Sequence, residues 1–329
     1  HRMIGSEEVY RATMSYLDWR VYGFFFSFIA VMFRAFYVST TNTKILTANS
    51  VVMVLTNVVL NYILIFGKFG FPALGIAGAA IASSISEAVS VLFFVIYTWK
   101  KIDYKKYGLF RFTRVDFRML GQILSVSIWV MIQHGIAFGG WFIFFIAMEH
   151  LGERPLAITN VVRSISSFLF MFVNAFASTN SSLVSNLIGA GESDRVLPLC
   201  RRMIGLCYAF VLPIGILIAM FPSTVLRIYT DNPDLIASSI PSLWVMLSSY
   251  LFAVPGFIYF FSVSGTGNTR RALEIDMASI FVYVLYILYV AVWLRADVAV
   301  CWTTEYVYNI MILSSFFYLW KGNWRNKKI

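Results

Sequence analysis

Long stretches without a charged residue limit what this chain can fold into more than any other feature. Five runs contain no Asp, Glu, Lys or Arg: residues 45–66, 119–148, 203–226, 235–269 and 277–294. A helix needs about 20 apolar residues to cross a bilayer, and it satisfies its backbone hydrogen bonds internally. Four further runs hold at most one or two charges: residues 21–38, 72–99, 155–190 and 298–320. The pattern predicts an all-α membrane protein with nine spanning helices.

The distribution of charge predicts the orientation of these helices. The net charge is +10, which could suggest a nucleic-acid partner, but the basic residues gather in alternate loops. Eighteen Lys and Arg residues fall on one side and seven on the other. Because cytoplasmic loops carry the excess of basic residues, we expect the carboxyl end to be cytoplasmic and no nucleic acid to bind.

Few residues offer catalytic or metal chemistry. The three cysteines, Cys200, Cys207 and Cys301, have no paired spacing, so we expect neither a disulfide framework nor a metal site beyond a possible sodium ion. The sequence has no HExxH motif and no GxSxG context. We therefore do not expect an enzyme.

A short repeated string indicates an internal duplication. GTGNTR, residues 265–270, resembles a phosphate loop, but it joins two predicted spans and lacks the Walker pattern. STTNTK, residues 39–44, lies 226 residues earlier in an equivalent place. Unless the match is accidental, spans one to three repeat as spans seven to nine in the same orientation, as in parallel-repeat transporters. Three further spans before residue 1 would then complete two six-helix bundles. We predict the end of a first lobe at 1–99, a basic cytoplasmic linker at 100–118 and a second lobe at 119–329.

Three segments resemble the multidrug and toxic compound extrusion (MATE) family. NVVLNYILIFGKFGFPALGIAGAAIASS, residues 57–84, is similar to the segment joining the fifth and sixth helices of that family. ASTNSSLVSNLIGAG, residues 177–191, and GTGNTRRA, residues 265–272, resemble loops of its second lobe. The resemblance covers the chain as family helices four to twelve.

The resemblance implies a secondary antiporter of the bacterial inner membrane that alternates access between two lobes. Such a protein exports amphipathic or cationic compounds in exchange for sodium ions or protons, and we expect no organic cofactor, contact with membrane lipids and a monomeric state. A lipid or polysaccharide flippase is the alternative, but flippases of this kind line their cavity with several basic residues. Arg163 is the one basic residue that we place inside the spans.

Polar residues within a membrane are functional candidates because their burial is costly. Asn57 and Asn61 share one face of a predicted helix, as do Ser83 and Glu87, and all four can lie at a similar depth. Their oxygens suit a hard cation, although helix packing is the alternative reading. The family has an Asn-x-x-x-Asp pair here, whereas this chain has an amide at the second position.

The second lobe offers four more polar candidates. Arg163 and Glu305 lie at equal predicted depth, so a buried ion pair is expected, as a switch or as a static strut. Gln133 replaces a glutamate that some family members carry, and the neighbouring His134 is either a titrating group or a packing residue.

Proline and aromatic residues mark the span at 235–269. Pro255 and Gly256 suggest a hinge for alternating access, with an ordinary kink as the alternative. Aromatic side chains of this span and of the span at 119–148 would suit a cavity for flat cations. They are Tyr250, Phe252, Phe257, Tyr259, Phe260, Phe261, Trp129 and Trp141.

Overall fold

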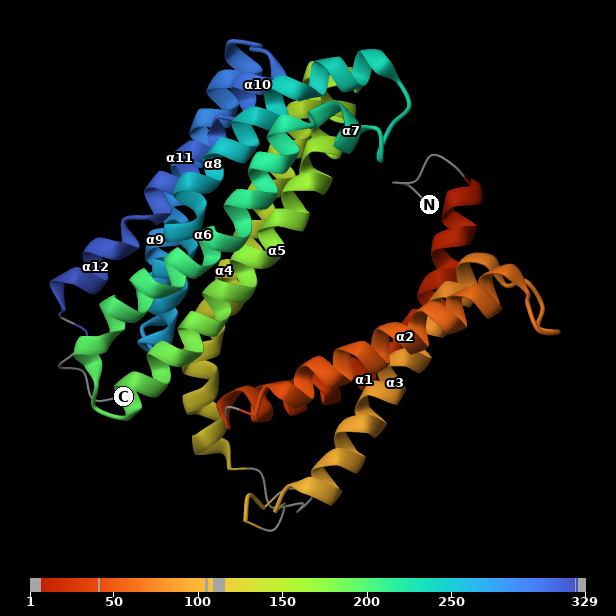
Figure 1. The fold of residues 1–329 in the computed structure, drawn as a ribbon, viewed down its shortest axis with the longest axis vertical. Coiled ribbons are helices and arrows are strands. Elements are labelled where there is room, and N and C mark those ends of the chain that lie inside the picture. The colour runs from red at the N-terminus through yellow and green to blue at the C-terminus, as the bar shows by residue number, and fades with distance from the viewer. Residues whose placement is uncertain (1–6, 41, 104–105, 109–115, 323, 325–329) are drawn as a thin grey trace. The chain divides into compact units, whose positions relative to one another are not determined.

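Every regular element in the described residues is a helix. The computed structural model describes residues 7–40, 42–103, 106–108, 116–322 and 324, so part of the predicted linker lies outside them. The chain divides into two units, His1–Arg114 and Val115–Ile329 (Figure 1). The lobe and linker bounds expected from the sequence stay a prediction.

The first unit contains three long helices, α1 (Glu7–Ser39), α2 (Lys44–Phe66) and α3 (Gly75–Lys101). Helix α3 packs against both others. The end of α2 packs closely on the start of α3 because Gly78 has no side chain: a Cβ there would lie 2.6 Å from the Leu64 carbonyl oxygen. At the opposite end of these helices, Tyr37, Ile45 and Phe94 form a small buried cluster.

The second unit is built around one central helix, α8, which contacts α5, α6, α9, α11 and α12. Glycines permit the closest contacts: a Cβ on Gly265 would lie 2.5 Å from the Ser181 carbonyl oxygen on α5, and one on Gly256 would lie 2.9 Å from Ile312 on α11. The elements are α4 (Phe117–Leu151), α5 (Glu153–Gly189), the 3₁₀ turn η1 (Ser193–Arg195), α6 (Val196–Met220), α7 (Pro222–Leu226), α8 (Pro233–Gly265), α9 (Thr269–Ile287), the π-helical turn η2 (Leu288–Trp293), α10 (Val298–Cys301), α11 (Thr304–Ile312) and α12 (Ser315–Lys321).

Eight helical segments of the described residues are long and apolar enough to cross a membrane. The expected ninth span, 298–320, is instead three short helices, α10, α11 and α12. At both junctions the backbone forms tighter i→i−3 hydrogen bonds, such as Glu305 N to Trp302 O at 3.1 Å and Phe316 N to Leu313 O at 2.9 Å. At the first junction the Thr304 hydroxyl also donates to the Cys301 carbonyl oxygen at 2.6 Å.

The predicted internal repeat is present in the helix boundaries. The 226-residue interval from Ser39 to Gly265 separates the last residue of α1 from the last residue of α8. Adding the same interval to the bounds of α2 gives residues 270–292. Helices α9 and η2 together form the segment Thr269–Trp293, which is one residue longer at each end. From the end of the first helix through the second helix, the two copies therefore share their boundaries without insertion or deletion.

Candidate functional site

An amide cluster lies between α2 and α3 in the first unit. The Asn57 amide donates to the Ser83 hydroxyl at 3.3 Å and to the Ser86 hydroxyl at 3.4 Å, and Asn61 donates to the Asn57 oxygen at 2.9 Å. The Asn61 side-chain oxygen is buried and has no hydrogen-bond partner among the described residues. Three of the four first-lobe candidates thus lie together, and their role in binding a coupling ion stays a prediction.

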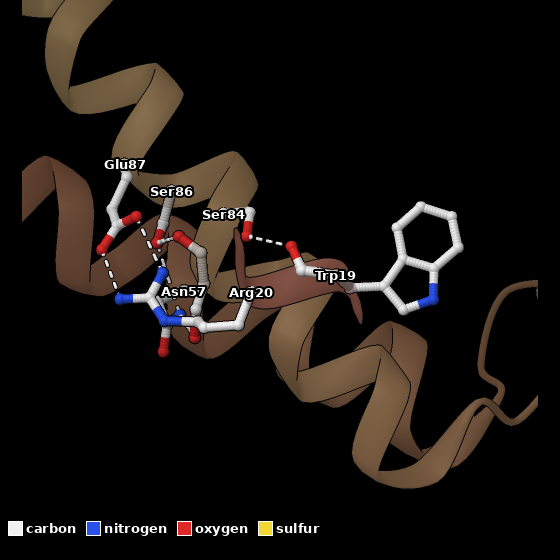
Figure 2. A network of polar contacts seen from close by, with 7 residues as sticks. Trp19, Arg20, Asn57, Ser84, Ser86 and Glu87 are labelled. Carbon is white, nitrogen blue, oxygen red and sulfur yellow. Dashed lines mark hydrogen bonds and ion pairs between the residues drawn. The ribbon is translucent and has the colours of Figure 1, made fainter. Parts of the chain in front are cut away.

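Glu87, the fourth candidate, is engaged with another residue. Arg20 on α1 forms a two-bond ion pair with its carboxylate, at 2.8 Å and 2.7 Å. Figure 2 shows the Arg20 guanidinium facing both carboxylate oxygens of Glu87, with the Ser86–Asn57 contact close by. The sequence predicts Arg20 outside the membrane because the first apolar run starts at residue 21. In the structure the candidate span Thr13–Ser39 includes Arg20.

A glycine on α1 makes room for this ion pair. A Cβ on Gly23 would lie 2.5 Å from Glu87 Oε2 and 2.8 Å from the Ser84 hydroxyl, and it would also clash with Arg20. The charged groups therefore pack directly over the α1 backbone. Such charge-assisted, two-bond pairs are among the stronger polar contacts in proteins.

The second unit encloses a chamber of about 490 Å³ between α4, α5, α8, α9 and α11. Gln133 and His134 line it, as the sequence led us to consider, and so does Glu305. No described side chain forms an ion pair or a hydrogen bond with the Glu305 carboxylate. Tyr250 and Tyr283 are close enough to this carboxylate to interact with it electrostatically.

Asp276 is the chamber residue that sequence reasoning missed. It is 2% exposed, and its carboxylate accepts a hydrogen bond from the Tyr308 hydroxyl at 3.0 Å. Gln133 and His134 lie beside the same carboxylate. The uncharged run begins at residue 277, so Asp276 falls just outside it. The pair Arg270–Arg271 could have indicated its place, because these residues mark the start of α9. Asp276 then lies more than one turn inside the helix.

The prediction of an ion pair between Arg163 and Glu305 is wrong: the described residues do not form it. Arg163 is exposed and does not line the chamber. Its guanidinium carbon lies 4.4 Å from the ring centre of Phe145 and 4.9 Å from that of Trp141. Equal depth along two helices does not fix the direction of the side chains, and here Arg163 points toward α4.

Aromatic side chains form much of the chamber wall. Of the eight rings considered from the sequence, Tyr250, Phe257, Phe260, Phe261 and Trp141 line it, whereas Phe252, Tyr259 and Trp129 do not. Phe170 meets Phe257 edge to face at 4.8 Å between ring centres. Helix α8 continues past Pro255, so a hinge at Pro255 and Gly256 stays a prediction, while Gly256 is needed for the contact with α11.

Membrane-spanning helices around a chamber lined by carboxylates and aromatic rings are typical of secondary transporters. The sequence comparisons make the assignment specific. Residues 1–63 and 130–292 match the MatE family. The chain therefore belongs to the MatE family of multidrug and toxic compound extrusion transporters.

Bacterial proteins are among its relatives. The Probable multidrug resistance protein NorM of Thermotoga maritima is 29% identical over 239 residues, which cover 72% of this chain and 50% of the relative. The protein of the same name in Bacillus cereus is 30% identical over 205 residues, covering 59% and 42%. The chain thus spans about half the length of the relatives that it matches.

Solved structures share the fold. The crystal structure of MATE in complex with MaL6 has a TM-score of 0.85 and covers 98% of this chain and 72% of that chain. A mutant of the Vibrio cholerae MATE transporter VcmN has a TM-score of 0.83 and covers 98% and 73%. Both are 17% identical to this chain, a level at which the likeness establishes the fold alone.

Proposed function

We propose that the full protein is a secondary antiporter that exports amphipathic or cationic compounds in exchange for sodium ions or protons. The observation that carries the proposal is the chamber, because its walls combine the carboxylates of Asp276 and Glu305 with aromatic rings. A flippase for pyrophosphate-linked cargo would need the opposite charge. None of the described residues that line the chamber is Lys or Arg.

The dimensions of the chamber support a small-molecule cargo. Ligand pockets commonly have volumes of about 300–1,000 Å³, and the chamber has about 490 Å³. Aromatic faces attract organic cations, and a buried carboxylate neutralises their charge. The names of the relatives, which describe multidrug resistance proteins, agree with this class of cargo.

The coupling ion would act on the same carboxylates. The amide cluster of the first unit has no free charge, since Glu87 is already paired with Arg20. In contrast, the Glu305 carboxylate has no charged partner among the described residues. An incoming sodium ion or proton can therefore neutralise it and displace the cargo, while the two lobes alternate access to either side of a bacterial plasma membrane.

Transport in vesicles tests this proposal. The full-length protein would be reconstituted in liposomes, and efflux of ethidium would be followed under an imposed sodium or proton gradient. We expect gradient-dependent efflux that is lost in Asp276→Asn and in Glu305→Gln but kept in Glu192→Gln, a control at an exposed carboxylate. Absence of gradient-dependent efflux together with lipid scrambling would replace the antiporter with the flippase.

A further inference from the structure

A second cavity lies at the basic end of the second unit, between α9 and the pair α11–α12. It has a volume of about 560 Å³ and is separate from the chamber, with which it shares no lining residue. Figure 1 shows α11 and α12 following one another beside α9, and α11 packs against α9. The feature is therefore a groove between helices that belong to one unit.

The end of the groove at the helix termini is positively charged. Arg271, in the first turn of α9, and Lys321, in the last turn of α12, line it together with the carboxylate of Glu274, so the basic groups outnumber the acidic one. One Nη group of Arg271 donates a hydrogen bond to the Glu274 carboxylate, and the guanidinium has further N–H donors. No described side chain pairs with the Lys321 ammonium. Asn268 donates to the Tyr318 hydroxyl at 2.7 Å and connects the two sides of the groove at this end.

The groove becomes apolar away from this end. Ile275 and Ala278 line it from α9, and Met311 and Phe317 line it from the opposite side. Ala278 lies about 10 Å deeper along the helix axis than Arg271, at 1.5 Å per residue. Phe317 is 60% exposed, so the wall of the groove faces the surface of the unit. The groove thus runs from the cationic side chains at the ends of α9 and α12 to apolar side chains about 10 Å further along α9.

We propose that this groove binds an anionic phospholipid, with the phosphate between Arg271 and Lys321 and an acyl chain along Ile275, Ala278 and Met311. Basic pockets between membrane helices are suited to acidic head groups, and the apolar trough distinguishes a lipid from a free phosphate ion. This site is independent of the proposed transport function, since it shares no residue with the chamber.

Native mass spectrometry of the full-length protein in detergent would test the site, using phosphatidylglycerol and phosphatidylcholine with identical acyl chains. We expect the wild type to retain phosphatidylglycerol. The double variant Arg271→Gln/Lys321→Gln should bind it about thirty-fold more weakly, because each basic residue near the membrane surface contributes about five- to six-fold to the affinity for an anionic lipid. Ala278→Phe would fill the trough and weaken binding without changing the charge. Arg195→Gln is the matched control, since Arg195 pairs with Glu192 in the same i,i+3 arrangement as Arg271 with Glu274 but lies outside the groove.

Three outcomes would overturn the proposal. The first is unchanged phosphatidylglycerol retention in both Arg271→Gln/Lys321→Gln and Ala278→Phe. The second is an equal loss in Arg195→Gln, which would indicate unspecific charge attraction. The third is displacement of the lipid by millimolar inorganic phosphate, which would indicate an ion site without a lipid chain.

Discussion

The contact between Gly23 and the Arg20–Glu87 ion pair yields a quantitative prediction. In Gly23→Ala the new methyl group would lie 2.5 Å from Glu87 Oε2, so that oxygen must move by about 1 Å to reach van der Waals distance. Such a shift breaks the two-bond geometry, in which the bonds are 2.8 Å and 2.7 Å long. The side chains of Arg20 and Glu87 are only 22% and 14% exposed, so water replaces the lost contact poorly.

The expected free-energy change follows from two opposing contributions. Loss of one hydrogen bond between charged groups costs about 1.5–3 kcal/mol. Alanine gains up to about 1 kcal/mol over glycine inside a helix. We therefore predict that Gly23→Ala lowers the free energy of unfolding by about 1–2 kcal/mol. Thermal unfolding of the full-length protein in detergent, followed by tryptophan fluorescence, would measure the difference.

Two comparisons isolate the cause. Gly205→Ala is the control, because a Cβ at this helical position on α6 meets no atom within 4 Å and should be neutral or stabilising. In the background Arg20→Ala/Glu87→Ala the clash with the ion pair is gone, so Gly23→Ala should cost much less. An equal cost in that background, or a Gly23→Ala protein as stable as Gly205→Ala, would refute the reasoning.

Three further predictions concern the second unit. Gly265→Ala should destabilise the protein by about 2 kcal/mol, because its Cβ would lie 2.5 Å from the Ser181 carbonyl oxygen, a backbone atom that cannot rotate away; a cost no larger than that of Gly205→Ala in thermal unfolding would contradict this. Asn180→Ala should cost about 1–3 kcal/mol, since the buried amide donates to Ser262 at 2.7 Å and to Cys200 at 3.4 Å, whereas the exposed Asn186→Ala on the same helix should change little. Tyr308→Phe removes the donor to Asp276 and should lower stability by about 1–3 kcal/mol while ethidium efflux persists; loss of efflux as complete as in Asp276→Asn would assign the hydroxyl a role in transport itself.

The sequence predicted the helical membrane fold because spanning length and absence of charge leave little alternative. It also predicted the repeat, since STTNTK and GTGNTR follow α1 and α8 at equivalent positions. It did not predict the interruption of the last span. The i→i−3 turns before Glu305 and before Phe316 depend on local backbone bonding, which a count of apolar residues does not detect.

The candidate site was only partly predictable, and the misses have one physical cause. Depth along a helix can be estimated from residue number, but the direction of a side chain depends on packing between helices. Asn57 and Asn61 share a face of α2 because of their i,i+4 spacing, and Ser83 meets Asn57 where α3 packs against α2. Arg163 and Glu305 have no such constraint, and the aromatic face of α4 binds the guanidinium instead. Arg20 and Asp276 were missed because each lies at the edge of an apolar run.

Direct binding of a cation to the chamber tests the central claim. Isothermal titration of tetraphenylphosphonium into the purified full-length protein would compare the wild type with Asp276→Asn, Glu305→Gln and the control Glu192→Gln. A carboxylate about 5 Å from the bound charge contributes about 3 kcal/mol at an effective dielectric constant of about 20. We predict that each chamber variant weakens the affinity about 100-fold and that the control does not. Equal affinities in all four proteins would contradict the assignment of the chamber as the cation site.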